Sequence, residues 1–485
     1  MVTSEIVYQI LSYIFFLYLI VITIKIILEN RPPEELLAWL VILIFLPYVG
    51  AIFYILTGID WKKQNRKIIK HIPEKAFENF AGTIIDHQKE FVAEVSQEID
   101  NDIAKTATML LKSSNSPITM HNSCEFYFDG SSHFFALMRD LEHATSSIHM
   151  EYYIWRSDEL GERIKDILIR KRREGVEVRL IFDGIGCFGK ISRRYRRELK
   201  EAGIEFRYFL DPLSLLWGRM INYRNHRKIV VIDGKIAYSG GMNIGTEYVS
   251  GGKRYPSWRD THMRLGGESV QLLQSVFFSD WHNSGGRIPD SSKYFCLEGY
   301  GEAKLPVQIV TSGPDSDWES IKQLFFLLIS NADKEIYIQS PYFIPDSAIM
   351  EALETAALSG ISVQLMITGV PDKRIPWYVA QTYFENLLKA GVRIFLYTRG
   401  FFHAKVFMAD SSISTVGTCN MDLRSFSLDY EINAVFYDKH VALTLKESFE
   451  RDREFCTEVK YSNFQKRNIF VRLRNSILRV LAPVL

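Results

Sequence analysis

Two copies of one sparse pattern in this chain carry side chains suited to phosphoryl chemistry. Each copy has a histidine, a lysine two residues later, an aspartate five residues further on, and an asparagine seventeen residues after the histidine. The copies are His226, Lys228, Asp233 and Asn243, and His403, Lys405, Asp410 and Asn420. Because the same spacing recurs so far downstream, we interpret the copies as two halves of one site.

The residue types indicate nucleophilic catalysis at phosphorus. One histidine can attack phosphorus while the other protonates the leaving alcohol. A lysine supplies a positive charge and an asparagine a neutral donor, and both favour the negative charge that builds on phosphoryl oxygens. We assign His226 as nucleophile and His403 as general acid, and the near symmetry of the copies leaves the opposite assignment open.

The sequence around the first copy predicts a hairpin. RKIVVID and KIAYSG flank the Asp233–Gly234 pair, a strong turn signal. We therefore expect His226 and Lys228 on one face of a single strand, and Asp233 at the turn, where it braces the loop. Asp410 is expected to do the same in the second copy.

Each histidine also needs a carboxylate to hold its other ring nitrogen. Asp260 and Glu431 are candidates, because each lies about thirty residues after the histidine of its own copy. The alternative for both is an ordinary buried ion pair.

The elements that must position these groups alternate between β-rich and helical segments. This pattern is typical of an α/β fold with mostly parallel sheets. SSIHMEYYIW and VEVRLIFDG read as strands around a charged helix over 159–173, and KEIYIQSPYFIP and ISVQLMIT flank a second helix over 348–358. EGVEVRLIFD and SGISVQLMIT match, which indicates a duplication. We predict lobes at 118–290 and 300–460.

The N-terminal part predicts a membrane anchor over residues 1–60. Residues 6–28 and 36–57 are apolar runs, each long enough for a helix that crosses a bilayer. Basic residues crowd the exit of the second run, which places the following domains in the cytoplasm by the positive-inside rule. A re-entrant or shallow hairpin remains an alternative for these runs.

The other segments are a polar helical linker over 61–117 and a C-terminal segment over 461–485, which is basic and amphipathic. The C-terminal segment either lies on an anionic membrane surface or packs its apolar face on the second lobe. The net charge of +1 over 485 residues disfavours a nucleic-acid partner. Five scattered cysteines disfavour a disulfide framework or a zinc site.

On these residues the chain resembles the phospholipase D superfamily, which carries HxKxxxxD twice. The N-terminal runs and the segments MEYYIW, SPYFIPD, WRDTHMRLGG and VGTCNMDLRSFSLDYEIN resemble the bacterial cardiolipin synthases. The resemblance implies two similar phospholipase D-like lobes with mixed, mostly parallel sheets sandwiched by helices, after two transmembrane helices. One departure is Thr418, where the first copy has Gly241.

The resemblance implies a multi-pass enzyme of a bacterial cell membrane that transfers a phosphatidyl group between two phosphatidylglycerols. The products are cardiolipin and glycerol, and the intermediate is a phosphohistidine. The resemblance implies no cofactor and no metal, and leaves a homo-oligomer open. Rival readings are a phospholipase D, a phosphatidylserine synthase-like transferase, and a membrane scaffold that binds anionic lipid without turnover.

Overall fold

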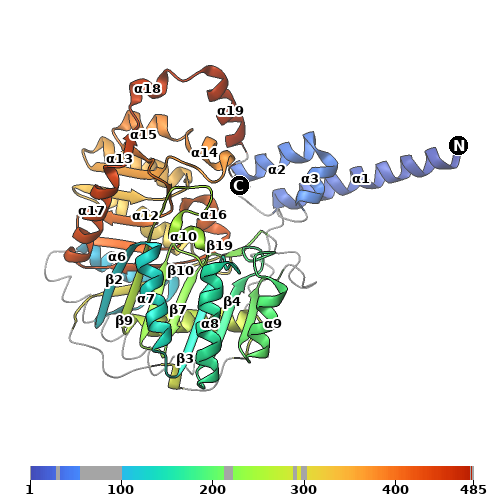
Figure 1. The fold of residues 1–485 in the computed structure, drawn as a ribbon. Helices are drawn as coiled ribbons and strands as arrows, with labels where there is room; N and C mark the ends of the chain where they lie inside the picture. Colours follow the sequence, from blue (N-terminus) through green and yellow to red (C-terminus); the bar gives the residue numbers. More distant parts are fainter. Residues whose placement is uncertain are drawn as a thin grey trace.

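The computed structural model describes residues 2–28, 33–54, 101–211, 222–287, 292–295, 303–480 and 482. Within these ranges the chain forms an N-terminal helical part and two α/β lobes that lie against each other (Figure 1). Most of residues 61–117, the expected linker, lie outside the described residues.

The first lobe is built on an eight-stranded sheet, with strand order β15-β9-β8-β7-β3-β4-β5 and β2 beside β9. Its strands are β2 (Asn122–Asp129), β3 (Ser147–Tyr152), β4 (Glu177–Asp183), β5 (Glu205–Phe209), β7 (Lys228–Ile232), β8 (Ile236–Gly240), β9 (Trp258–Gly267) and β15 (Phe401–Phe402). Its helices are α7 (Gly130–Glu142), α8 (Glu159–Arg173), α9 (Arg193–Glu201), α10 (Thr246–Ser250) and α11 (Ser269–Asn283), with a short 3₁₀ turn, η4 (Ser292–Tyr294).

The second lobe repeats this plan on a ten-stranded sheet, with order β1-β10-β19-β17-β16-β11-β13-β14-β20 and β6 beside β19. Its strands are β1 (Ile118–Thr119), β6 (Arg224–Asn225), β10 (Val307–Ser312), β11 (Glu335–Gln339), β13 (Ser362–Thr368), β14 (Arg393–Tyr397), β16 (Val406–Ala409), β17 (Ile413–Gly417), β19 (Asp429–Phe436) and β20 (Cys456–Glu458). A separate pair joins β12 (Phe343–Ile344) to β18 (Met421–Asp422).

The helices of the second lobe are α6 (Asn101–Ser114), α12 (Ser320–Ser330), α13 (Ser347–Leu358), α14 (Arg374–Ala380), α15 (Phe384–Ala390), α16 (Leu423–Ser427), α17 (Lys439–Arg453), α18 (Tyr461–Gln465) and α19 (Ile469–Arg479). Although it precedes the first lobe in the chain, α6 packs with α12, and Ala107 and Leu110 join the apolar core of the second lobe. The C-terminal part of the expected linker is thus an element of the second lobe.

The core consists of layers. α11 and α17 lie between the two sheets, in an apolar cluster that includes Phe277, Trp281, Leu445 and Phe449. α7, α8 and α9 cover the outer face of the first sheet, and α6, α12, α13 and α15 that of the second. The sheets are therefore sandwiched by helices, as expected.

The sheets are mixed, as expected, but the expectation that they are mostly parallel is wrong, since antiparallel pairs outnumber parallel ones among the described strands. Parallel pairing is found where helices cross over, in β3-β4-β5 and β11-β13-β14, and in the short two-residue pairs β6–β19, β15–β9 and β12–β18. The strands of the two motifs are joined by tight turns instead, so that β7-β8 and β16-β17 are antiparallel.

Local sequence explains several element boundaries. α8 spans Glu159–Arg173, the predicted range, because Asp158 accepts a hydrogen bond from the Gly161 amide (3.1 Å) at its N-terminus. Acidic residues lie in its first turn and basic residues in its last, which complements the helix dipole.

The N-terminal part contains one helix with the length and composition of a membrane span. α1 (Val2–Leu28) is 27 residues long, about 40 Å, and residues 8–28 are strongly apolar. Its side chains are largely exposed, including Tyr13 and Phe16 at 76% and 64%. A surface of this kind suits a lipid environment better than water.

The second apolar run does not form one continuous spanning helix. It divides at Leu46 (φ −131°, ψ 60°) into α2 (Pro33–Phe45) and α3 (Pro47–Phe53). Pro47 has no amide hydrogen to continue the helix, and it begins the next one. α3 then folds back on α2, so closely that a Cβ on Gly50 would lie 2.8 Å from the Ile42 carbonyl oxygen.

Candidate active site

The two histidines lie where the lobes exchange strands. β6, immediately before His226, pairs with β19 of the second lobe. β15, immediately before His403, pairs with β9 of the first lobe. The His226 amide donates to the Tyr430 carbonyl oxygen (2.9 Å) and the His403 amide to that of Arg259 (2.7 Å). Each histidine is therefore held at the edge of the opposite lobe.

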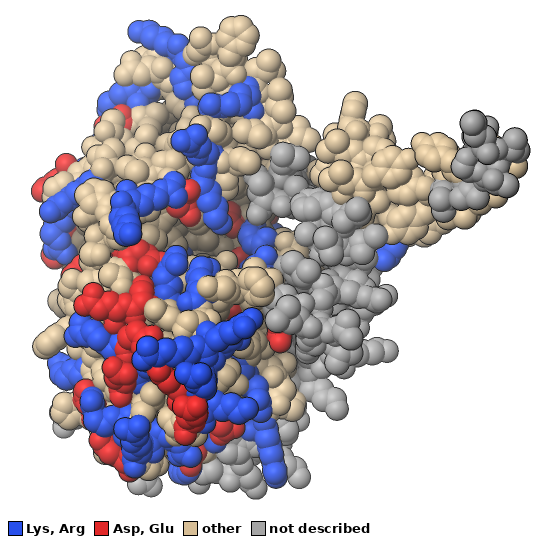
Figure 2. All heavy atoms as spheres, turned by 45° about the vertical axis from the view of Figure 1, so that its right-hand side comes forward, with Lys and Arg blue, Asp and Glu red and all other residues tan. Residues whose placement is uncertain are grey.

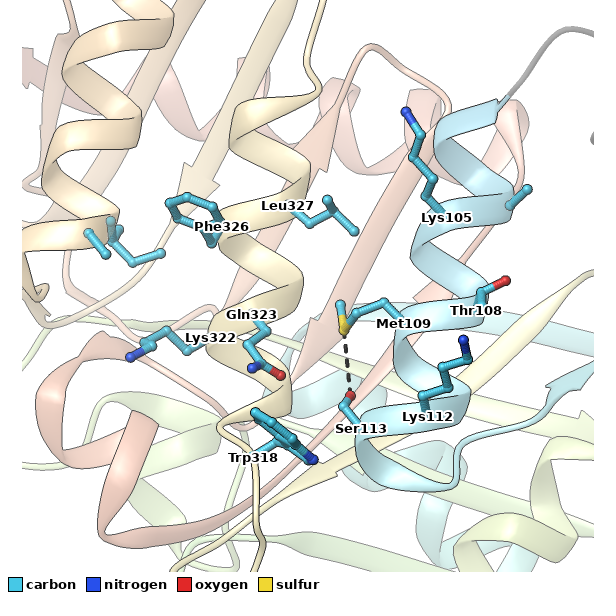
Figure 3. A pocket seen from close by; sticks show the side chains of 13 residues that line it. Lys105, Thr108, Met109, Lys112, Ser113, Trp318, Lys322, Gln323, Phe326 and Leu327 are labelled. Atoms are coloured by element: carbon cyan, nitrogen blue, oxygen red, sulfur yellow. Dashed lines mark hydrogen bonds between the residues drawn. The ribbon is translucent and has the colours of Figure 1, made fainter.

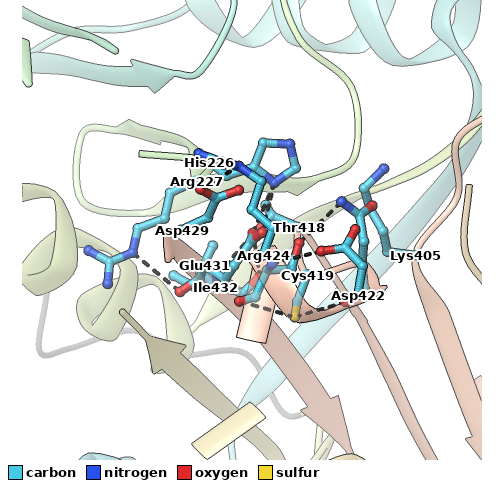
Figure 4. Close-up of polar contacts among 12 residues, drawn as sticks. His226, Arg227, Lys405, Thr418, Cys419, Asp422, Arg424, Asp429, Glu431 and Ile432 are labelled. Atoms are coloured by element: carbon cyan, nitrogen blue, oxygen red, sulfur yellow. Dashed lines mark hydrogen bonds and ion pairs between the residues drawn. The ribbon is translucent and has the colours of Figure 1, made fainter. Parts of the chain in front are cut away.

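This exchange pairs each histidine with the carboxylate of the other lobe. The Nδ1 atom of His226 lies 3.0 Å from both carboxylate oxygens of Glu431, as Figure 4 shows. The Nδ1 atom of His403 lies 2.7 Å from Oδ2 of Asp260. Both candidate carboxylates thus orient a histidine, but the expectation that each serves its own copy is wrong.

The strand expected to carry His226 and Lys228 begins only at Lys228. His226 and Arg227 lie between β6 and β7, where the backbone passes from one sheet to the other. Lys228 Nζ nevertheless returns to the histidine and donates to the His226 carbonyl oxygen, and Lys405 does the same to His403. The imidazole and the ammonium group are neighbours, as expected. They are brought together by a bend in the chain and not by a shared strand face.

Burial lowers the pKa of both lysine side chains. Both side chains are almost wholly removed from solvent. This burial lowers the pKa of Lys228 to about 7 and that of Lys405 to about 8, although Glu431 and Asp260 oppose the shift. A bound phosphate would raise both pKa values and so favour the charged ammonium forms.

Burial also keeps the histidines neutral in the ligand-free protein. It lowers the pKa of His403 to about 4, and the neighbouring Lys405 contributes. The pKa of His226 falls well below its usual range through burial and the charge of Lys228. A neutral histidine whose Nδ1 hydrogen is held by a carboxylate presents its Nε2 lone pair to a substrate.

The two carboxylates respond differently to the same depth of burial. Burial raises the pKa of Glu431 to about 7, despite the opposing charge of Lys228. Burial alone would also raise the pKa of Asp260, but His403 and Lys405 lower it below its usual value. Asp260 therefore remains an anion, while Glu431 is poised to share a proton.

A hydroxyl beside Glu431 distinguishes the half-sites further. Thr418 Oγ1 donates to Glu431 Oε2 and accepts from the Ile432 amide (2.9 Å). At the matching position a Cβ on Gly241 would come within 1.9 Å of Asp260 Oδ1. The departure from the first copy at Thr418, visible in the sequence, is thus a contact with the orienting carboxylate.

The motif aspartates brace the turns. Asp233 accepts hydrogen bonds from the amides of Thr145, Ser146 and Ser147 at 2.7–2.8 Å. Asp410 accepts from three amides in the matching loop, at residues 333–335. Both aspartates have left-handed backbone (φ 55° and 52°) and face away from the histidines.

The two motif asparagines are used differently. Asn243 accepts from the Ile154 amide (2.9 Å) and donates to the Tyr248 hydroxyl (2.8 Å), so both ends of its amide serve the protein. Asn420 donates to Ser425 Oγ (3.2 Å), and its buried Oδ1 has no partner among the described residues. Of these two side chains, the Asn420 amide is thus the one that is incompletely satisfied.

Aromatic rings around the histidines were not singled out from the sequence. The Tyr153 ring lies 5.0 Å from that of His226. Trp258 and Phe401 lie 5.5 and 5.7 Å from His403. Their only sequence signal is their position within MEYYIW, WRDTHM and FFHAK, the segments next to site residues.

A separate open groove of about 960 Å³ runs between α6, α12 and α13, lined by Met109, Trp318 and Phe326 and by several lysines (Figure 3). It contains none of the motif residues. Its lining has no histidine or carboxylate to handle a proton, so we place the chemistry at the paired histidines.

Comparison with known proteins identifies the family of this chain. The family described as "Cardiolipin synthase, PLD-like domain" matches residues 137–253 and 326–453, one segment in each lobe, and "Phospholipase_D-nuclease N-terminal" matches residues 14–58. A cardiolipin synthase of Halalkalibacterium halodurans is 40% identical over 466 residues, which cover 96% of this chain and 92% of that protein. The chain belongs to the cardiolipin synthase family.

Further relatives support the same family. A cardiolipin synthase of Clostridium perfringens is 39% identical over 468 residues, covering 94% of this chain and 96% of that protein. Among solved structures, the phosphatidylserine synthase of Haemophilus influenzae superposes with a TM-score of 0.62 at 15% identity, covering 79% of this chain and all of that one. The likeness to this solved structure concerns the fold. As a cardiolipin synthase family member, the protein is a phosphatidyltransferase associated with the membrane.

Proposed function

We propose that the protein joins two phosphatidylglycerols into cardiolipin and releases glycerol, through a phosphohistidine on His226. The observation that carries this proposal is the pair of histidines in one site, each held at Nδ1 by a carboxylate of the opposite lobe. Such a pair can supply a nucleophile and a general acid together. Membership of the family supports phospholipids as the substrates.

The difference between the carboxylates supports His226 as the nucleophile. A general acid must become an imidazolium, which an ionised partner stabilises, and Asp260 is the carboxylate whose pKa is lowered. The pKa of Glu431 is raised, so it stabilises a cationic His226 less. The bound phosphodiester offsets the charge of Lys405, so that His403 gains its proton as substrate binds.

The reaction then proceeds in two balanced displacements. His226 Nε2 attacks phosphorus, the bond from phosphorus to the glycerol headgroup oxygen breaks, and His403 gives its proton to that oxygen. Glycerol leaves. His403 next takes the proton of the terminal hydroxyl on a second phosphatidylglycerol, whose oxygen attacks phosphorus and breaks the bond to His226. The product is cardiolipin, and both histidines return to their starting state.

The remaining site residues have supporting roles in this proposal. Lys228 and Lys405 offset the charge on the phosphoryl oxygens. The Asn420 amide contacts the phosphate. Asn243 instead holds its own loop in position. Asp233 and Asp410 hold the turns. No step requires a metal ion or cofactor, and one chain supplies every group in the site, so a homo-oligomer is not needed for chemistry.

For the chain as a whole we propose an anchor over 1–60, a linker from residue 61 up to α6, catalytic lobes over 118–290 and 300–460 with α6 added to the second, and a surface segment over 461–485. The lobes face the bacterial cytoplasm, because basic residues follow the second apolar run. α1 spans the membrane, and the α2–α3 hairpin enters and returns. This topology places the N-terminus on the outer side of the membrane. If a Thr3→Cys variant were labelled from the cytoplasmic side, the chain would instead cross the membrane twice before the lobes.

Product analysis tests the reaction. Purified protein in liposomes receives phosphatidylglycerol as the only substrate, with and without EDTA, beside the His226→Ala and His403→Ala variants. We expect equal amounts of cardiolipin and glycerol, unaffected by EDTA and lost in both variants. Phosphatidic acid as the main product would indicate a hydrolase. Lipid binding without turnover would indicate a scaffold, and turnover that occurs only with added serine or another alcohol acceptor would contradict the proposed acceptor.

A further inference from the structure

The C-terminal helix α19 presents its apolar side to the outside. Five large apolar side chains are 49–75% exposed: Ile469, Phe470, Leu473 and Ile477 on the helix and Val480 directly after it. At 100° per residue they fall within an arc of about 100°, a single stripe along the helix. Arg472 lies beyond one edge of the stripe and Arg474 beyond the other. Arg472 is 3.5 Å from Glu385, yet its side chain remains 46% exposed.

The opposite side of α19 faces the second lobe and is largely polar. Asn475 is 1% exposed and donates to Gln381 Oε1 (3.4 Å). The Arg474 guanidinium lies 3.6 Å from the centroid of the Tyr378 ring. Leu478 is the apolar residue of α19 that packs against the core of this lobe. α19 therefore packs on the lobe through its polar side. Its apolar stripe does not take part in that contact.

Charge and position indicate what covers the stripe. Between residues 461 and 485 there are five basic residues and no acidic one. α19 lies on the side of the second lobe that is next to α2 and α3 (Figure 1). The same side, turned forward in Figure 2, is blue and tan at the top of the molecule, and red gathers lower, over the first lobe.

We propose that the apolar stripe of α19 inserts into the interface of the anionic bilayer that holds the N-terminal anchor, with the exposed Arg472 at a lipid phosphate. Long basic side chains flanking an apolar stripe suit this position, because their charges reach the headgroups while the stripe enters the acyl region. A second copy of this chain fits less well, since two identical basic helices would repel each other. The contact fixes the catalytic lobes against the membrane independently of α1.

Hydrogen–deuterium exchange on the full-length protein tests this contact. The protein is placed in nanodiscs of phosphatidylcholine alone, or with phosphatidic acid, an anionic lipid that carries no headgroup alcohol to release. We expect the amides of 469–480 to exchange about tenfold more slowly with phosphatidic acid. High salt should reduce the protection, because it screens the arginines. Equal exchange in both discs would overturn the proposal.

Matched variants identify the surface responsible. Leu473→Glu/Ile477→Glu should abolish the protection, whereas Leu358→Glu and Leu443→Glu, at exposed sites on α13 and α17, should leave it unchanged. If the double variant unfolds α19, exchange in phosphatidylcholine discs rises as well, and Arg472→Gln, which leaves the Arg474 contact with the lobe intact, then provides the test. Protection that depends on protein concentration would indicate a second copy and overturn the lipid assignment. None of these readouts requires turnover, so they are independent of the proposed reaction.

Discussion

The two halves of the active site have the same arrangement of residues but differ in the pKa of the carboxylate that holds the histidine. In one half His226 faces both oxygens of Glu431, which also accepts from Thr418. In the other, His403 faces one oxygen of Asp260, and this carboxylate fills the space that a side chain at Gly241 would need. A duplicated motif therefore has two electrostatic environments.

This difference shows how a symmetric duplication can divide two catalytic roles. Both histidines are buried beside a lysine, so burial and the lysine charge hardly distinguish them. The carboxylates do: the pKa of Asp260 is lowered and that of Glu431 is raised to about 7. An ionised partner favours the histidine that must carry a proton, and a partly protonated one favours the histidine that must stay neutral.

The largest expected effect separates the roles of the two histidines. His226→Ala and His403→Ala should each reduce turnover of phosphatidylglycerol by about 10⁴-fold. A phosphatidyl ester of p-nitrophenol needs no protonation of its leaving group, so it should restore release of nitrophenol in His403→Ala alone. Stopped-flow absorbance measures this release, with His226→Ala as the matched control in the same assay. Rescue of His226→Ala instead would reverse the assignment.

The next effect concerns the backbone beside Asp260. Gly241→Ala places a methyl group where Asp260 Oδ1 lies, so the carboxylate must move away from His403. We expect kcat to fall by about 10²-fold, as for a catalytic group displaced by about 1 Å. The matched change Thr418→Ser keeps the hydroxyl at Glu431 and should leave kcat nearly unchanged. Equal losses in the two variants, measured by steady-state kinetics, would contradict the comparison.

The pH dependence should report the buried lysines. The ammonium forms attract the anionic substrate and exist below the pKa values of about 7 and about 8. Since kcat/KM reflects the free enzyme, it should fall as pH rises, by about tenfold for each pH unit between the two values and by up to about a hundredfold for each unit above both. Bound phosphate raises both pKa values, so the fall in kcat should begin at higher pH. A flat profile of kcat/KM from about pH 7 to about pH 9 would refute this.

The smallest effect tests the hydroxyl at Glu431. Thr418→Val keeps the shape of the side chain but removes the donor to the carboxylate, which should raise the pKa of Glu431 further. We expect about a fivefold loss of kcat, from the loss of one hydrogen bond worth about 1 kcal/mol. Steady-state kinetics beside Thr418→Ser measure it. A loss as large as that of Gly241→Ala would mean that the half-sites are equally sensitive.

Local sequence was sufficient for much of the fold. The bounds of α8 and the turn at Asp233 follow from capping residues and an Asp-Gly pair, which act within a few positions. The repeat of the HxK pattern likewise predicted two similar lobes. The direction of most strands was not predictable, because it depends on whether a turn or a helix connects them.

The missed features depend on contacts that form only when the chain folds back on itself, whatever the separation of the residues in the sequence. Pro47 was visible, but the return of α3 onto α2 depends on the approach of Gly50 to Ile42. Thr418 was visible as a departure from the first copy, but its role depends on the position of Glu431. The aromatic rings beside the histidines likewise had no periodic or spacing signal.

The sequence by itself determined the chemistry of this protein, because that chemistry depends on residue types and on a spacing repeated in two copies. Only the tertiary structure decided which carboxylate serves which histidine. His226 and Glu431 are 205 residues apart, and they meet because β6 adds to the sheet of the second lobe while β15 adds to that of the first. Spacing along the chain is local information, whereas strand exchange between lobes is a property of the packed molecule.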